Sequence, residues 1–177
     1  EFNRLHGLNL YLRDEIQAQF IRFHETGLVL DHVNGHLNLH IHPTVLGLLC
    51  ERAGEHRLRA LRLPRDPFWL NVRLASGQWA YRLTHAVIFA VLCACARPRL
   101  CRLRVRHTRA VFGLLQNGRV DAGFICRLLA RLPAGDSELY CHPSLTEGRH
   151  ELEALLSPRA RETASRESIR LIRYQDL

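Results

Sequence analysis

The sequence contains no methionine and no lysine, so all 25 of its basic residues are arginines. A chain that opens at Glu1 and lacks methionine is expected to be a piece whose natural start is missing. No signal-peptide pattern is visible. The longest apolar run, Ala86 to Ala96, is far shorter than the roughly 20 residues of a membrane span. We therefore expect a cytoplasmic chain with no transmembrane segment, in which this run is a buried core helix.

Aromatic residues are scarce, at 7%, while the net charge is +8 and the calculated pI is about 9.8. An excess of positive charge of this kind is typical of proteins that bind nucleic acids. The arginines are scattered, however, and few aromatic residues lie between them. The densest run, Arg97 to Arg109, could face phosphates, but such a run is more typical of a solvated face. We expect no nucleic-acid partner.

The cysteines form no Cys-x-x-Cys pair, and most lie inside apolar, helix-like patterns. Disulfide frameworks are typical of short secreted chains, so reduced, buried thiols are the expected state. A zinc site from Cys93, Cys95 and Cys101 is disfavoured because the first two point to different faces of a helix. Apolar residues make up 47% of the 177 residues, which predicts one sizeable domain over residues 1–177.

Hydrophobic periodicity predicts alternating helices and strands. The expected helices cover residues 12–26, 44–52, 81–96, 120–132, 151–156 and 159–166. The expected strands cover residues 29–33, 57–63, 100–106, 137–140 and 169–174, and an irregular connection covers 68–77. Strands that alternate with helices indicate parallel βα units, so the predicted class is α/β.

Four histidines, one aspartate and two asparagines lie within residues 31–43, where an apolar strand is expected to end. In parallel α/β folds this edge is where chemistry is usually built. Imidazole is a common metal ligand and the side chain most easily tuned for proton transfer near neutral pH. The stretch therefore predicts a metal site or an acid–base site, with a solvated polar turn as the alternative.

A second strand end carries His142, directly before Pro143. If both strands belong to one sheet, their histidines open on the same edge. Neighbouring residues of a strand face opposite ways, so Cys141 should point away from His142, which disfavours thiol catalysis. Metal-assisted hydrolysis fits better: one histidine holds the ion and another donates a proton to the leaving group.

The run Asp31-His-Val-Asn-Gly-His36-Leu-Asn-Leu-His40-Ile-His-Pro43 resembles the T-H-x-D-G-H-x-H-x-H-x-x-P segment of YdjC-like carbohydrate deacetylases, the family that includes ChbG and HpnK. Four further segments are similar to family segments in the same order. They are Arg59-Ala-Leu-Arg62-Leu-Pro-Arg65-Asp-Pro67, Val111-Phe-Gly-Leu-Leu-Gln-Asn-Gly118-Arg, Glu138-Leu-Tyr-Cys-His142-Pro143 and Leu171-Ile-Arg-Tyr174-Gln-Asp176-Leu. The proline-rich turn and Glu138-Leu-Tyr are closest to the hopanoid-associated HpnK branch.

This resemblance implies a distorted (β/α) barrel that removes the N-acetyl group from an amino sugar, with a divalent Mg or Zn ion as cofactor. His36 occupies the position of a metal ligand, and His142 occupies the position proposed for proton donation or substrate contact. The substrate-binding positions correspond to His32, His40 and Arg62. The barrel would lack its first strands here, and the exposed sheet edge that results predicts homodimerisation.

The chain also departs from the family pattern. Asn34 stands where the family has an aspartate, Asn38 stands where it has a histidine, and the N-terminal Asp-Asp strand is not in the chain. Two alternatives to an active deacetylase therefore remain, a non-catalytic basic binding module and a degenerate family remnant.

Overall fold

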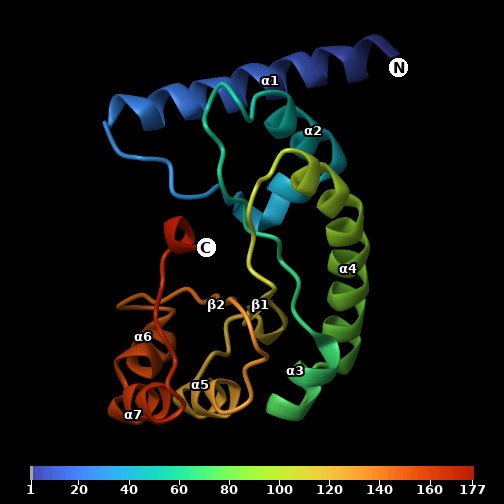
Figure 1. Cartoon of the computed structure of the whole chain (residues 1–177). Coiled ribbons are helices and arrows are strands. Elements are labelled where there is room, and N and C mark those ends of the chain that lie inside the picture. The colour runs from blue at the N-terminus through green and yellow to red at the C-terminus, as the bar shows by residue number, and fades with distance from the viewer. Residues whose placement is uncertain (1) are drawn as a thin grey trace. The chain divides into compact units, whose positions relative to one another are not determined.

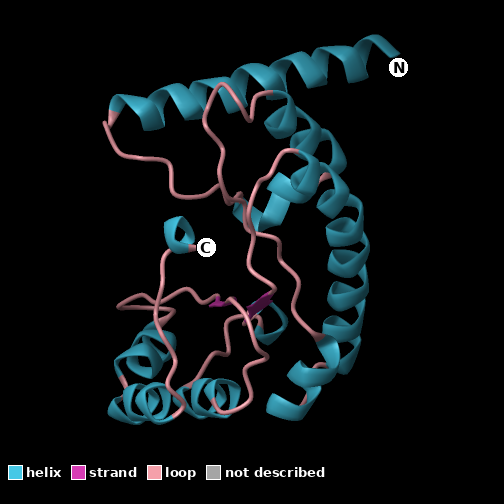
Figure 2. Cartoon of the chain, in the orientation of Figure 1, coloured by secondary structure: helices cyan, strands magenta, loops and turns pink. Residues whose placement is uncertain are grey.

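The computed structural model describes residues 2–177, with side chains from Asn9 onwards. Its elements are labelled in Figure 1, and Figure 2 shows that helices dominate. The larger elements, in chain order, are α1 (Phe2–Glu25), α2 (Pro43–Glu51), α3 (Phe68–Leu74), α4 (Trp79–Arg102), β1 (Ala110–Phe112), α5 (Ala122–Leu129), β2 (Ser137–Leu139), α6 (Arg149–Leu156) and α7 (Pro158–Arg166). Three short 3₁₀ turns, η1 (His36–Ile41), η2 (Leu114–Gln116) and η3 (Tyr174–Asp176), complete the order.

The mixed α/β class is confirmed, since β1 and β2 pair in parallel, with Val111 opposite Glu138. Two of the expected strands are reduced to single parallel bridges, Val33 with Leu61 and Ala60 with Arg106. The strand expected at 100–106 is wrong because α4 continues through Arg102. The strand expected at 169–174 is also wrong: these residues form no ladder, and Leu171 is 88% exposed. The connection at 68–77 contains α3 instead of being irregular.

The chain divides into two compact units, which are described separately. Unit 1 comprises residues 1–62, 92–107 and 173–177, and unit 2 comprises residues 63–91 and 108–172. In unit 1, α1 lies beside α2 (Figure 1), and Phe20 stacks on the His56 ring with centroids 4.0 Å apart. Pro43 occupies the first turn of α2, where its missing N–H costs no hydrogen bond.

Helix α4 is long and apolar enough to cross a membrane by length and composition alone. It was expected to be a buried core helix, and this expectation is wrong, because only 17% of its most apolar 18-residue window is buried. Leu83, Val87, Ile88 and Val91 are exposed on it. No disulfide joins the cysteines that the structure describes, whereas Cys95 and Cys101, near the C-terminal end of α4, are exposed instead of buried as expected.

Unit 2 places β1, β2 and α5 around one core that includes Phe112, Phe124 and Leu128. Figure 1 shows α5, α6 and α7 grouped together in this unit. Beside the core lies a buried carboxylate, Asp66, which accepts hydrogen bonds from the Leu115 N–H at 3.0 Å and from the Asn71 side-chain amide at 3.3 Å. Burial raises the pKa of Asp66 to about 6 despite these donors.

Candidate active site

The histidine-rich stretch of unit 1 forms a strained loop. Its 3₁₀ turn η1 begins at His36, and the next two residues, Leu37 and Asn38, adopt left-handed backbone angles, with φ of 51° and 59°. Consecutive left-handed residues other than glycine are costly and tend to persist where a loop has a function. The loop therefore presents His36, which is exposed, on an unusually constrained backbone.

His40 is the buried anchor of this loop. Its Nδ1 accepts a hydrogen bond from the Gly35 N–H at 2.9 Å, so its Nε2 carries the proton and donates to the Arg62 carbonyl at 2.7 Å. A Cβ on Gly35 would lie 2.9 Å from the His40 main-chain nitrogen, which explains glycine at that position. Burial lowers the pKa of His40 to about 4. With both nitrogens occupied by backbone groups, His40 ties the loop to Arg62.

This arrangement predicts acid sensitivity. The folded pKa of His40, about 4, lies below the unfolded value of 6.5, so the folded state binds fewer protons between these limits. The free energy of unfolding should therefore fall by about 2 kcal/mol from pH 7 to pH 5 through this residue. His40→Gln, which keeps an acceptor and a donor but does not titrate, should remove that part of the loss in urea titrations. The control is His150→Gln, at an exposed histidine. If this variant reduced the pH-dependent loss of stability equally, the attribution of that loss to His40 would be wrong.

His32 takes part in a second group of polar contacts in unit 1. Its ring stacks on Tyr174, with centroids 4.0 Å apart, and its Nδ1 donates to the Asp31 carboxylate at 3.0 Å. The other oxygen of Asp31 accepts from the Gln175 N–H at 2.9 Å. The carboxylate thus holds the His32 ring in one tautomer and ties it to the C-terminal segment.

The predicted metal ligand, His36, has no matching ligand set in this structure. Among the side chains that the structure describes, no group of three or more His, Cys, Asp or Glu is arranged to hold an ion. A catalytic zinc normally has three protein ligands. The described residues therefore do not fit a complete metal site, and the role of His36 as a ligand stays a prediction.

The predicted proton donor, His142, lies in unit 2 just beyond the carboxyl end of β2. Its ring is exposed, and its Nε2 lies 2.6 Å from the Tyr140 hydroxyl. The buried Glu151 carboxylate accepts from the His142 main-chain N–H at 2.6 Å and, through its other oxygen, from the Val120 N–H at 3.0 Å. A fixed backbone thus carries an imidazole that is open to solvent and paired with a phenol.

Two glycines allow close approach to this segment. A Cβ on Gly113, where φ is +101°, would lie 2.0 Å from the Tyr140 carbonyl oxygen. A Cβ on Gly148 would lie 1.9 Å from the His142 carbonyl oxygen. Any larger residue at either position would displace the main chain that carries His142.

The structure joins Arg62 with His40, and it adds two partners of His142 that were not predicted, Tyr140 and Glu151. The contact with Tyr140 could have been anticipated if the expected strand had continued to residue 142, because residues two apart on a strand share a face. No signal in the sequence distinguishes Glu151 from the other acidic residues near it. His36 and His142 belong to different units, so a shared site for their side chains stays a prediction.

Comparison with known proteins agrees with the family resemblance of these sequence segments. The sequence profile of the family described as YdjC-like protein matches residues 9–166. A mouse (Mus musculus) protein named carbohydrate deacetylase is 28% identical over 200 residues, covering 94% of this chain and 62% of its own length. The chain therefore spans about three fifths of the curated relative that it matches. No solved structure gives a significant match. The family profile covers most of the chain, which therefore belongs to the YdjC-like family.

Proposed function

We propose that this chain takes part in removing N-acetyl groups from an amino sugar, with His142 as the proton donor. The observation that carries the proposal is the exposed imidazole of His142, held 2.6 Å from the Tyr140 hydroxyl on a backbone fixed by buried Glu151. Family membership and the carbohydrate deacetylase name of the mouse relative support this reaction class. The proposed fold is part of a distorted (β/α) barrel.

Amide hydrolysis needs an acid because an amine leaves poorly without a proton. In the proposed step, water adds to the acetyl carbon and loses a proton, and protonated His142 gives its proton to the sugar nitrogen as the carbon–nitrogen bond breaks, which leaves acetic acid and the free amine. The Tyr140 hydroxyl orients the ring through its contact with Nε2. Arg62, whose carbonyl accepts a hydrogen bond from His40, is the proposed contact to sugar hydroxyls in unit 1. Both a chito-oligosaccharide and a lipid-linked amino sugar present the required N-acetyl group.

Dependence on a divalent ion, Mg or Zn, is part of this proposal, with His36 as the ligand that this chain contributes. The constrained backbone after His36 supports that role. Homodimerisation is proposed as well, since a barrel that lacks its first strands would leave a sheet edge exposed.

Acetate release from an N-acetylated chito-oligosaccharide, measured with Mg and with Zn, tests the function. His142→Ala should lower kcat by about 100-fold or more, because general acid catalysis typically contributes 10²–10⁴-fold. His36→Ala should abolish the stimulation by metal. His150→Ala, a control at an exposed histidine of α6, should leave the rate unchanged. Equal rates for His142→Ala and the parent chain, or no acetate release by the parent, would refute the proposal.

One observation favours a second candidate, a non-catalytic family member. The described side chains include no group of three metal-binding residues. Such a protein would release no acetate, and its thermal stability would respond neither to added Zn or Mg nor to His36→Ala. A metal-dependent shift in melting temperature that disappears in His36→Ala would exclude this candidate.

A further inference from the structure

A cavity of about 540 Å³ in unit 1 is rimmed by four arginines, Arg57, Arg59, Arg104 and Arg106. Its remaining lining is mostly apolar, with Ala53 and Leu58 buried and Leu103 half exposed. All four arginines are exposed, and none forms an ion pair with a carboxylate in the part of the chain that the structure describes. The cavity therefore concentrates positive charge without internal compensation.

The four arginines belong to two matching segments, Arg57-Leu58-Arg59 and Arg104-Val105-Arg106. The Leu58 N–H bonds the Ala53 carbonyl and the Val105 N–H bonds the Leu100 carbonyl, five residues back in each case. Arg57 and Arg104 are left-handed, with φ of 52° and 56°. Both segments thus end a helical stretch in a Schellman-type cap, with arginine where glycine is usual.

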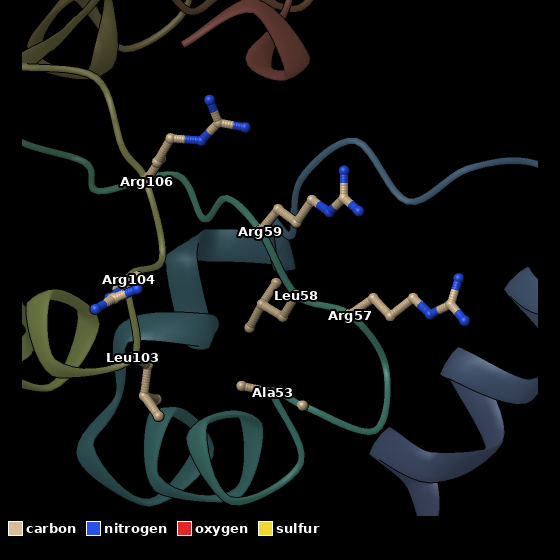
Figure 3. Close-up of a pocket in the computed structure, with 8 residues that line it drawn as sticks. Ala53, Arg57, Leu58, Arg59, Leu103, Arg104 and Arg106 are labelled. Carbon is tan, nitrogen blue, oxygen red and sulfur yellow. The ribbon is translucent and has the colours of Figure 1, made fainter.

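The backbone also brings the second arginine of each segment together. The Arg106 N–H donates to the Arg59 carbonyl at 2.8 Å, and Ala60 forms a parallel bridge with Arg106. In Figure 3, the side chains of Arg57, Arg59 and Arg106 extend to one side, whereas Arg104 extends to the other. Three of the four side chains therefore extend in the same general direction from the two segments.

Ordinary helix capping accounts for only part of this arrangement. A cation at a helix C-terminus interacts favourably with the helix dipole, which explains arginine at positions 57 and 104. The left-handed backbone at these two positions is part of the same caps. Neither the dipole nor the caps explain Arg59 and Arg106, which lie beyond them.

We propose that this cavity binds a small ligand that carries two linked phosphate groups. Guanidinium groups bind phosphate oxygens in bidentate pairs, and the hydrogen bond from the Arg106 N–H to the Arg59 carbonyl places two of the four arginines on neighbouring segments. A volume of about 540 Å³ is in the range of small-molecule sites and accommodates a diphosphate with an attached apolar or sugar group. This site is independent of the proposed deacetylation.

Calorimetric titration of the full chain with inorganic pyrophosphate tests the proposal. We expect saturable binding that weakens as salt rises, because the charges are exposed. Arg59→Ala/Arg106→Ala should weaken binding at least tenfold. Arg161→Ala/Arg170→Ala removes the same charge from exposed positions of unit 2 and should change affinity less than twofold. Circular dichroism of each variant establishes that it is folded, and Arg59→Lys/Arg106→Lys, which keeps the charge, should bind with intermediate affinity.

Three results would overturn the proposal. The first is absence of pyrophosphate binding at millimolar concentration, and the second is equal binding by the parent and Arg59→Ala/Arg106→Ala. The third is stronger binding of a macromolecular polyanion through the same arginines. A single-stranded oligonucleotide would then indicate a nucleic-acid surface, and vesicles containing phosphatidylglycerol would indicate a lipid surface. Either outcome would show that these arginines do not serve a small phosphorylated ligand.

Discussion

Gly113→Ala should lower the free energy of unfolding by about 3 kcal/mol or more. Position 113 has φ of +101°, a conformation that residues with a Cβ rarely adopt. The added methyl group would lie 2.0 Å from the Tyr140 carbonyl oxygen. Tyr140 must then move away, which weakens the hydrogen bond from its N–H to the Phe112 carbonyl, 2.7 Å in the parent. Urea unfolding followed by circular dichroism measures the loss.

Gly118→Ala is the matched control for this prediction. Gly118 is also left-handed, with φ of +73°, but no atom lies within 4 Å of the position that a Cβ would take. This variant should lose only about 1 kcal/mol, the cost of the backbone conformation alone. Similar losses in the two variants would show that contact with Tyr140 is unimportant.

Glu151→Ala should destabilise the chain by about 3–5 kcal/mol. The Glu151 side chain is 1% exposed, and its two oxygens accept from the N–H groups of Val120 and His142. Alanine leaves both donors without a partner, and an unsatisfied buried group costs about 1–3 kcal/mol, with a cavity cost in addition. Glu151→Gln keeps one acceptor oxygen and should lose about half as much.

Two measurements distinguish this role of Glu151 from a general effect of losing charge. Glu153→Ala, which breaks only an exposed pair with Arg149, should cost less than about 0.5 kcal/mol. Amide hydrogen exchange should accelerate at Val120 and His142 in Glu151→Ala. Unchanged exchange at both amides would contradict the proposed anchoring of the His142 segment.

Helices were predictable because their signals are local. The spacing of Leu46 and Leu49 and the position of Pro43 predicted α2 nearly to the residue. Strands depend on partners elsewhere in the chain, and the sequence does not show whether a partner is present. The alternation in residues 100–106 was ambiguous, because Leu100 and Leu103 are also spaced for one face of a helix. In the structure, α4 continues through Arg102.

The candidate site was predicted unevenly. His36, His40 and His142 were predicted from histidine density and from family resemblance, which depend on residue type. The role of each residue depends on its surroundings. His40 is a buried anchor, which neither its neighbours in sequence nor its spacing indicated. Glu151 acts through contacts with residues 9 and 31 positions away, and such contacts leave no periodic signal in the chain.

The buried carboxyl group of Asp66 affects how the chain unfolds as the pH falls. Its folded pKa of about 6 lies above its usual value of 3.8, so its stabilising contribution grows as protons are added across that interval. His40 has the opposite dependence in unit 1. Acidification should therefore produce a partly folded intermediate, in which unit 2 keeps its structure after unit 1 has melted.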